Sequence, residues 1–153
     1  SLRKEPVASL EGRRRLGFWA DDAQPLVNPS SVVIAWNESV EALSAVRAAL
    51  PILTAADEGH VAIIDPPTHG PTRSDPGGML SQYLARHGVK VEIDVLSKTL
   101  PRVSDILMRH AEDMDADLMV MGAYGHSRFR EAIFGGATRS MLEHATIPVL
   151  MAH

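Results

Sequence analysis

The fold is decided by residues 31–64, which read SVVIAWNESVEALSAVRAALPILTAADEGHVAII. Val32 to Trp36 and Val61 to Ile64 are continuous apolar runs, typical of strands that are buried on both faces of a parallel sheet. Between them, apolar residues recur at helical spacing from Val40 to about Ala56, after polar residues suited to a helix cap. Pro51 falls inside this helix and is expected to kink or end it. The stretch predicts a β-α-β unit.

Strands and helices continue to alternate along the rest of the chain. Gly59 is expected to end the connection before the second strand, and Gly88 to stop a helix. The further expected helices are residues 79–87, a helix opened by Pro101, and residues 136–144; the further strands are residues 89–95, 118–121 and 147–151. This order predicts the α/β class, with an open five-stranded parallel sheet that is doubly wound, helices covering both faces.

Composition excludes several classes of protein. The chain has 153 residues, 45% hydrophobic and 22% charged, a net charge of −4 and no cysteine. Disulfides, thiolate metal sites and thiol nucleophiles are therefore ruled out. The mild acidity argues against a nucleic-acid partner, and no apolar run is long enough for a membrane helix. We expect a protein of the cytoplasm, with neither nucleic acid nor membrane as partner.

Residues 1–29 differ in kind from the remainder. They carry the basic run Arg13 to Arg15 and the acidic pair Asp21 and Asp22, and show no helical or alternating period of useful length. We interpret 1–29 as an arm or linker, or the remnant of a preceding domain. A disordered terminus with a solvated charge run is an equal alternative. Residues 30–153 are expected to form one domain.

The residues best suited to bind a ligand follow the predicted strands. Ligands of such sheets sit outside the carboxyl ends of the strands, and Asn37, Asp65 and Gly122 come directly after three of them. Residues 122–138 read GAYGHSRFREAIFGGAT, with two pairs of glycines before a predicted helix. Glycine lets backbone N–H groups approach an anion, and a helix start favours phosphate. The alternative is that these glycines only form a tight turn and a hinge.

The glycine spacing resembles that of a known family. Gly122, two residues, Gly125, nine residues and Gly135 followed by a small residue are similar to the nucleotide signature of universal stress proteins. The resemblance covers residues 31–153, including the final Pro-Val strand, and is strongest to the C-terminal half of bacterial tandem-domain members. It implies the sheet order 3-2-1-4-5, an adenine-nucleotide alpha-hydrolase-like fold, and ATP, with Mg²⁺, as ligand.

The resemblance also implies which residues meet the nucleotide. Asn37 stands where the family usually has Asp, and Gly136 where the signature has Ser or Thr, so binding is expected to be retained but weakened. Trp36 is expected to pack near the ligand rather than stack on the base. The candidate nucleotide-binding residues are Ala35, Trp36, Asn37, Ile63, Asp65, Met121, Gly122, Gly125, His126, Arg128, Gly135, Gly136, Ala137 and Thr138.

The sequence gives little sign of metal binding or catalysis. The seven histidines show no spacing typical of a metal site, and no nucleophile elbow, Walker lysine or zinc-protease motif is present, so we expect neither a resident metal site nor an enzyme. The favoured function is a nucleotide-responsive stress sensor that dimerises. The alternative is a nonbinding assembly module that pairs with another domain, or a second copy, through strand Ile147–Met151. An adenine-nucleotide hydrolase or transferase is the weaker alternative.

Overall fold

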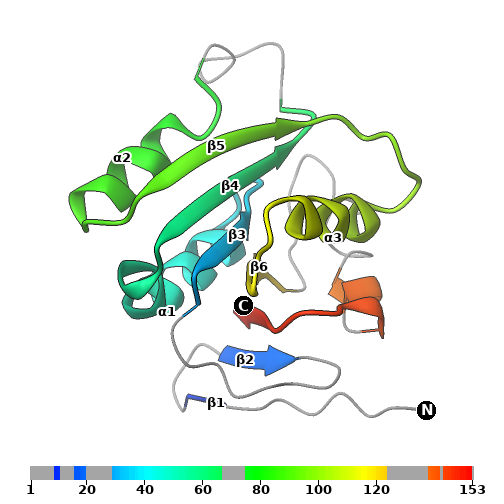
Figure 1. Cartoon of the computed structure of the whole chain (residues 1–153), viewed down its shortest axis with the longest axis horizontal. Coiled ribbons are helices and arrows are strands. Elements are labelled where there is room, and N and C mark those ends of the chain that lie inside the picture. Colours follow the sequence, from blue (N-terminus) through cyan, green and yellow to red (C-terminus); the bar gives the residue numbers. More distant parts are fainter. Residues whose placement is uncertain are drawn as a thin grey trace.

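The computed structural model describes residues 9–10, 16–19, 29–66, 75–123, 138–141 and 143–152. Among them, strands and helices alternate from β3 onward, as Figure 1 shows. The strands are β1 (Ser9–Leu10), β2 (Leu16–Trp19), β3 (Ser31–Ala35), β4 (Glu58–Ile64), β5 (Val91–Leu96), β6 (Leu118–Gly122) and β7 (Val149–Ala152). The helices with printed bounds are α1 (Val40–Ala55), α2 (Gly78–Arg86) and α3 (Val103–Asp113). Residues 138–141 and 143–144 are also helical.

The five predicted strands form the parallel sheet that the sequence indicates. Neighbouring strands run in the order β5-β4-β3-β6-β7, which is 3-2-1-4-5 when these five are counted along the chain. Each of the four pairs between them is parallel. The predicted fold class and strand order are therefore confirmed.

Alternate residues of each central strand enter opposite layers of the core. Val33 and Ala35 of β3 pack with α3 and the last helical stretch, whereas Val32 and Ile34 pack with α1 and α2. All four side chains are at most 1% exposed. Because both faces are covered, the strands read as unbroken apolar runs rather than alternating ones.

Pro51 does not end its helix, and Gly59 does not precede the second strand. Helix α1 runs through Pro51 to Ala55, and Leu53 beyond the proline is 1% exposed in the core. Packing of this last turn outweighs the missing proline N–H. Gly59 lies inside β4 rather than before it, and its N–H donates to the Lys90 carbonyl at 2.8 Å. The ending of α2 is as expected: Gly88 follows it with φ of 78°, a left-handed conformation that glycine adopts readily.

The segment interpreted as an arm contributes two strands that the sequence did not predict. Strand β2 pairs antiparallel with β7, from Leu16 opposite Ala152 to Trp19 opposite Val149, and β1 pairs with β2. Figure 1 shows β2 beside β7, the red strand near the C-terminus, and β1 on the other side of β2. The edge of β7 that was expected to be open for a partner is therefore occupied by the chain itself. The boundary between arm and domain at residue 30 stays a prediction.

Asp117 ties the start of β3 to the start of β6. Its two carboxylate oxygens accept from the backbone N–H groups of Ser30 and Ser31, at 2.8 and 3.1 Å. The Asp117 N–H donates back to the Ser31 carbonyl at 3.0 Å. These bonds fix the register between β3 and β6, two neighbouring strands in the middle of the sheet.

We expect Asp117→Ala to lower the free energy of unfolding by about 1 to 2 kcal/mol, because two backbone N–H groups lose a charged acceptor at a partly solvated position. Urea unfolding followed by circular dichroism measures the change. Asp113→Ala is the matched control, since the Asp113 side chain is exposed and makes no hydrogen bond or ion pair among the described residues. Equal stability of the two variants would contradict a role for Asp117 in fixing the strands.

In the described part of the chain, no helix combines the length and apolar character needed to cross a bilayer.

Candidate functional site at the carboxyl ends of the strands

The topology places a switch point between β3 and β6. From β3 the chain proceeds outward through β4 to β5, and from β6 it proceeds the opposite way to β7. In open parallel sheets, ligands bind outside the carboxyl ends of the two strands at such a point. Asn37 and Gly122 stand at these two strand ends, so the structure brings together the residues after the first and fourth predicted strands.

The turn between β3 and α1 is shaped by its own side chains. The Asn37 Oδ1 accepts from the Ser39 N–H at 3.1 Å, and Glu38 between them has φ of 63°, in the left-handed region. Ser39 caps α1, its Oγ accepting from the Ala42 N–H at 3.1 Å. The first turn of α1, which carries partial positive charge, is thereby held beside the end of β3.

Gly122 allows β6 to approach that same helix turn. A Cβ at position 122 would lie 2.6 Å from the Ala42 nitrogen and 2.7 Å from the Glu41 carbonyl carbon. Both atoms belong to backbone, which cannot rotate away. The requirement for glycine here comes from the packing of α1 against β6, a reason that the signature alone does not reveal.

The second strand end is more distant from the switch point. Asp65 is exposed, with φ of 44°, and its Oδ1 accepts from the Lys98 N–H at 3.3 Å. Its own N–H donates to the Leu96 carbonyl at 2.9 Å. Ile63 is 7% exposed and packs beneath Gly77 of the turn before α2. Asp65 is therefore oriented by the segment after β5.

The remaining predicted residues divide into buried and undescribed ones. Met121 and Thr138 are fully buried and Ala35 is 1% exposed, so the Met121 and Ala35 side chains belong to the core and only their backbone is left to face a ligand. Trp36 is half-buried against the α1 and α2 layer, and its place near a ligand stays a prediction. The following predicted residues lie outside the described part of the chain: Gly125, His126, Arg128, Gly135, Gly136 and Ala137.

One polar cluster was missed by the sequence interpretation. His60 of β4, Asp94 of β5 and His110 of α3 meet through hydrogen bonds on the α3 face of the sheet. The three residues come from three elements, so no local spacing reveals them. The available signals were a histidine on the apolar stripe of a helix and the alternation of acidic residues along β5.

Comparisons with known proteins place the chain among proteins of one family. The model of the universal stress protein family matches residues 30–153. A universal stress protein from Synechocystis is 34% identical over 101 residues, which cover 60% of this chain and 34% of that protein. The chain thus spans about a third of the length of this curated relative.

Solved structures share the fold at low sequence identity. UspA from Lactobacillus plantarum has a TM-score of 0.64 at 16% identity, covering 84% of this chain and all of that one. A universal stress protein in complex with cAMP has a TM-score of 0.58 at 20% identity, covering 83% of this chain and 98% of that one. The fold is the adenine-nucleotide alpha-hydrolase-like one of these proteins. Given the family match across most of its length, the chain belongs to the universal stress protein family.

Proposed function

We propose that this protein binds an adenine nucleotide, ATP with Mg²⁺ foremost, at the carboxyl ends of β3 and β6, and acts in the cytoplasm as a stress-response sensor that dimerises. The observation that carries the proposal is the meeting of a capped helix start with a glycine strand end at the switch point. Phosphate oxygens favour such a corner because helix N–H groups and the helix dipole stabilise negative charge.

The family comparison supports the nucleotide class. One structural neighbour was solved with cAMP, an adenine nucleotide. In this chain, Asn37 stands beside the helix start with its amide oxygen used by the Ser39 N–H, which leaves its NH₂ group to donate to a ligand. The role is that of a binding protein rather than an enzyme; a weak nucleotide hydrolase or transferase activity would be secondary to it.

A second candidate function rests on the edge of the sheet. Pairing of β2 with β7 demonstrates that this edge accepts an antiparallel strand. An assembly module without nucleotide binding would use the same edge for a partner strand in place of β2. The two candidates differ in whether ATP stabilises the fold.

Thermal unfolding with and without ATP and Mg²⁺ tests the choice. A ligand at 100 times its dissociation constant adds about 2.7 kcal/mol to the free energy of unfolding. For a chain of this length, that corresponds to a rise in Tm of roughly 5 to 11 °C. No rise at millimolar ATP would reject nucleotide binding and leave the assembly module.

A variant pair localises the binding in the same measurement. Asn37→Ala removes one hydrogen-bonding side chain from the site and is expected to weaken ATP binding by about tenfold, the equivalent of about 1.4 kcal/mol. Gln82→Ala, on the exposed side of α2, should bind as the unmodified chain does. Equal ATP affinity in both variants would place the nucleotide elsewhere.

A further inference from the structure

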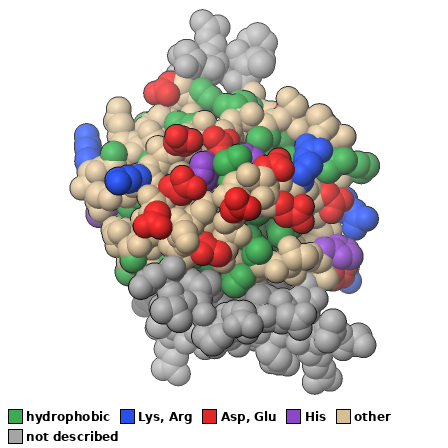
Figure 2. Space-filling view, in the orientation of Figure 1, with side chains coloured by type: hydrophobic (Ala, Val, Ile, Leu, Met, Phe, Trp, Pro, Cys, Tyr) green, Lys and Arg blue, Asp and Glu red, His purple; other side chains and the backbone are tan. Residues whose placement is uncertain are grey.

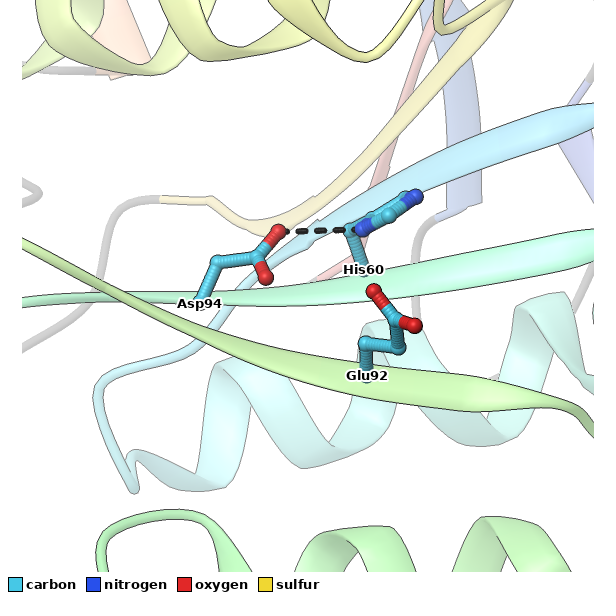
Figure 3. A group of neighbouring side chains, drawn as sticks. All are labelled: His60, Glu92 and Asp94. Atoms are coloured by element: carbon cyan, nitrogen blue, oxygen red, sulfur yellow. Dashed lines mark hydrogen bonds and ion pairs between the residues drawn. The ribbon is translucent and has the colours of Figure 1, made fainter.

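A buried histidine lies between two carboxylates on the α3 face of the sheet. His60 is 5% exposed, and its Nδ1 is 3.0 Å from Oδ2 of Asp94 on the neighbouring strand (Figure 3). The Nε2 of His110, from α3, lies 2.7 Å from the same oxygen. Because a carboxylate oxygen only accepts, each ring nitrogen can hydrogen-bond to it only when that nitrogen carries a proton.

This arrangement leaves one ring nitrogen of His60 unsatisfied. Its Nε2 is buried and has no hydrogen-bond partner. The Oε1 of Glu58 is 3.6 Å away, beyond hydrogen-bond reach. With the proton on Nδ1, a neutral ring presents a bare lone pair to this carboxylate, which is unfavourable. With the proton on Nε2, the lone pair on Nδ1 faces Asp94 instead. A cation at Nδ1 removes the conflict, since Nε2 can then donate toward Glu58.

A third ligand is close enough to complete a metal site. One ligand atom each from His60, Glu92 and Asp94 lies within 4.8 Å of the others. A tetrahedral metal with ligand distances of about 2.1 Å needs its ligands about 3.4 Å apart. The exposed Glu92 side chain makes no hydrogen bond or ion pair within the described ranges and is free to close this gap.

The charge around the cluster favours a cation. Glu58, Glu92 and Asp94 are three carboxylates, and none of them forms an ion pair with a lysine or arginine among the described residues. Figure 2 shows acidic side chains gathered at the centre of the face over the sheet, with a histidine among them and the basic side chains toward its margins. The face therefore carries an unbalanced negative potential.

We propose that His60, Asp94 and Glu92 bind Zn²⁺, with the His60 Nδ1 and one oxygen of each carboxylate as ligands and water in the fourth position. One imidazole with two carboxylates is a ligand set suited to this borderline ion. His110 and Glu58 are the outer partners. The first donates to Asp94 at 2.7 Å, and the second lies 3.6 Å from the His60 Nε2, where its negative charge favours a proton on that nitrogen.

The zinc site is separate from the nucleotide site and does not depend on it. His60 pairs with Val33 in the middle of the sheet, whereas the nucleotide residues follow Ala35 and Ile63 at the strand ends. Three residues of strand from His60 to Ile63 span about 10 Å. Mg²⁺ held by ATP would therefore not occupy these ligands.

Zinc titration of the metal-free intact chain, without nucleotide, tests this inference. Isothermal titration with ZnSO₄ is expected to show one tight equivalent, and NMR of the imidazole nitrogens should show His60 Nδ1 bound to the metal with the ring proton on Nε2. Glu92→Gln is expected to weaken the affinity at least tenfold and Asp94→Asn further. Glu92→Gln changes an exposed side chain and keeps the core intact, so the test survives if variants of the buried His60 fail to fold.

The control is Glu112→Gln, an exposed carboxylate on α3 outside the cluster, which should bind zinc as the unmodified chain does. The absence of a tight equivalent would overturn the proposal. So would a tight equivalent of undiminished affinity in Glu92→Gln and Asp94→Asn, since zinc would then be held by other residues. Neither result bears on ATP binding, which is measured separately.

Discussion

Gly122→Ala is expected to lower the free energy of unfolding by about 3 kcal/mol, the upper end of what overpacking of one methyl group causes. The added Cβ would meet the Ala42 nitrogen at 2.6 Å and the Glu41 carbonyl carbon at 2.7 Å. Since both are backbone atoms of the first turn of α1, relief requires the helix to move away from β6. Thermal unfolding should show a Tm lower by about 6 to 12 °C.

The matched control separates steric from conformational effects. Gly88 has φ of 78°, and a Cβ there would have nothing within 4 Å. Gly88→Ala is therefore expected to lose only about 1 kcal/mol, from the left-handed backbone. A loss at Gly122 no greater than at Gly88 would contradict the close packing of α1 on β6.

The same pair connects packing to the proposed nucleotide site. Displacement of the first turn of α1 moves the helix N–H groups that are proposed to face phosphate. Gly122→Ala should therefore show little or no rise in Tm with ATP, whereas Gly88→Ala should keep the rise of the unmodified chain. If both variants respond equally to ATP, the corner between β6 and α1 is not where the nucleotide binds.

The sheet was predictable because strands that are buried on both faces have a recognisable sequence, an unbroken run of apolar residues. Residues of β3 and β6 enter both core layers in turn, so almost every position must be apolar. Polar and apolar residues alternate along β5, a pattern typical of an edge strand, and β5 ends the sheet order. These signals are local, and a local pattern is what a sequence shows directly.

Strand β2 and the His60 cluster escaped prediction for the opposite reason. The four residues of β2 are too few for a period, and their partner β7 lies more than a hundred residues along the chain. His60, Asp94 and His110 become neighbours only when β4, β5 and α3 are assembled. Of the candidate site, the sequence indicated the strand ends after β3 and β6, but not that the packing of α1 requires glycine at position 122.

Removal of the N-terminal strands is expected to strengthen dimerisation strongly. Strand β2 occupies the edge of β7 along its length, so a second copy must displace it to pair there. A strand tethered by a short connection competes at an effective concentration of about a millimolar. Against a partner copy at about micromolar concentration, this amounts to roughly a thousandfold disadvantage, or about 4 kcal/mol. A chain that starts at Pro29 lacks β1 and β2, so no strand of its own competes for β7. It keeps the hydrogen bond from the Ser30 N–H to Asp117.

Sedimentation velocity at micromolar concentration should show the full chain mainly as monomer, because β2 shifts its dimerisation to higher concentration, and the shortened chain as dimer. A direct charge substitution in β7 is unsuitable, because Val149 is fully buried and a lysine there would disrupt the core. A synthetic peptide of residues 9–19, added to the shortened chain, should restore the monomer by pairing with β7 in trans, and a scrambled peptide of the same composition should not. If the two chains sediment alike, or the peptide has no effect on a dimer, the interface lies away from β7 and dimerisation is not controlled by β2.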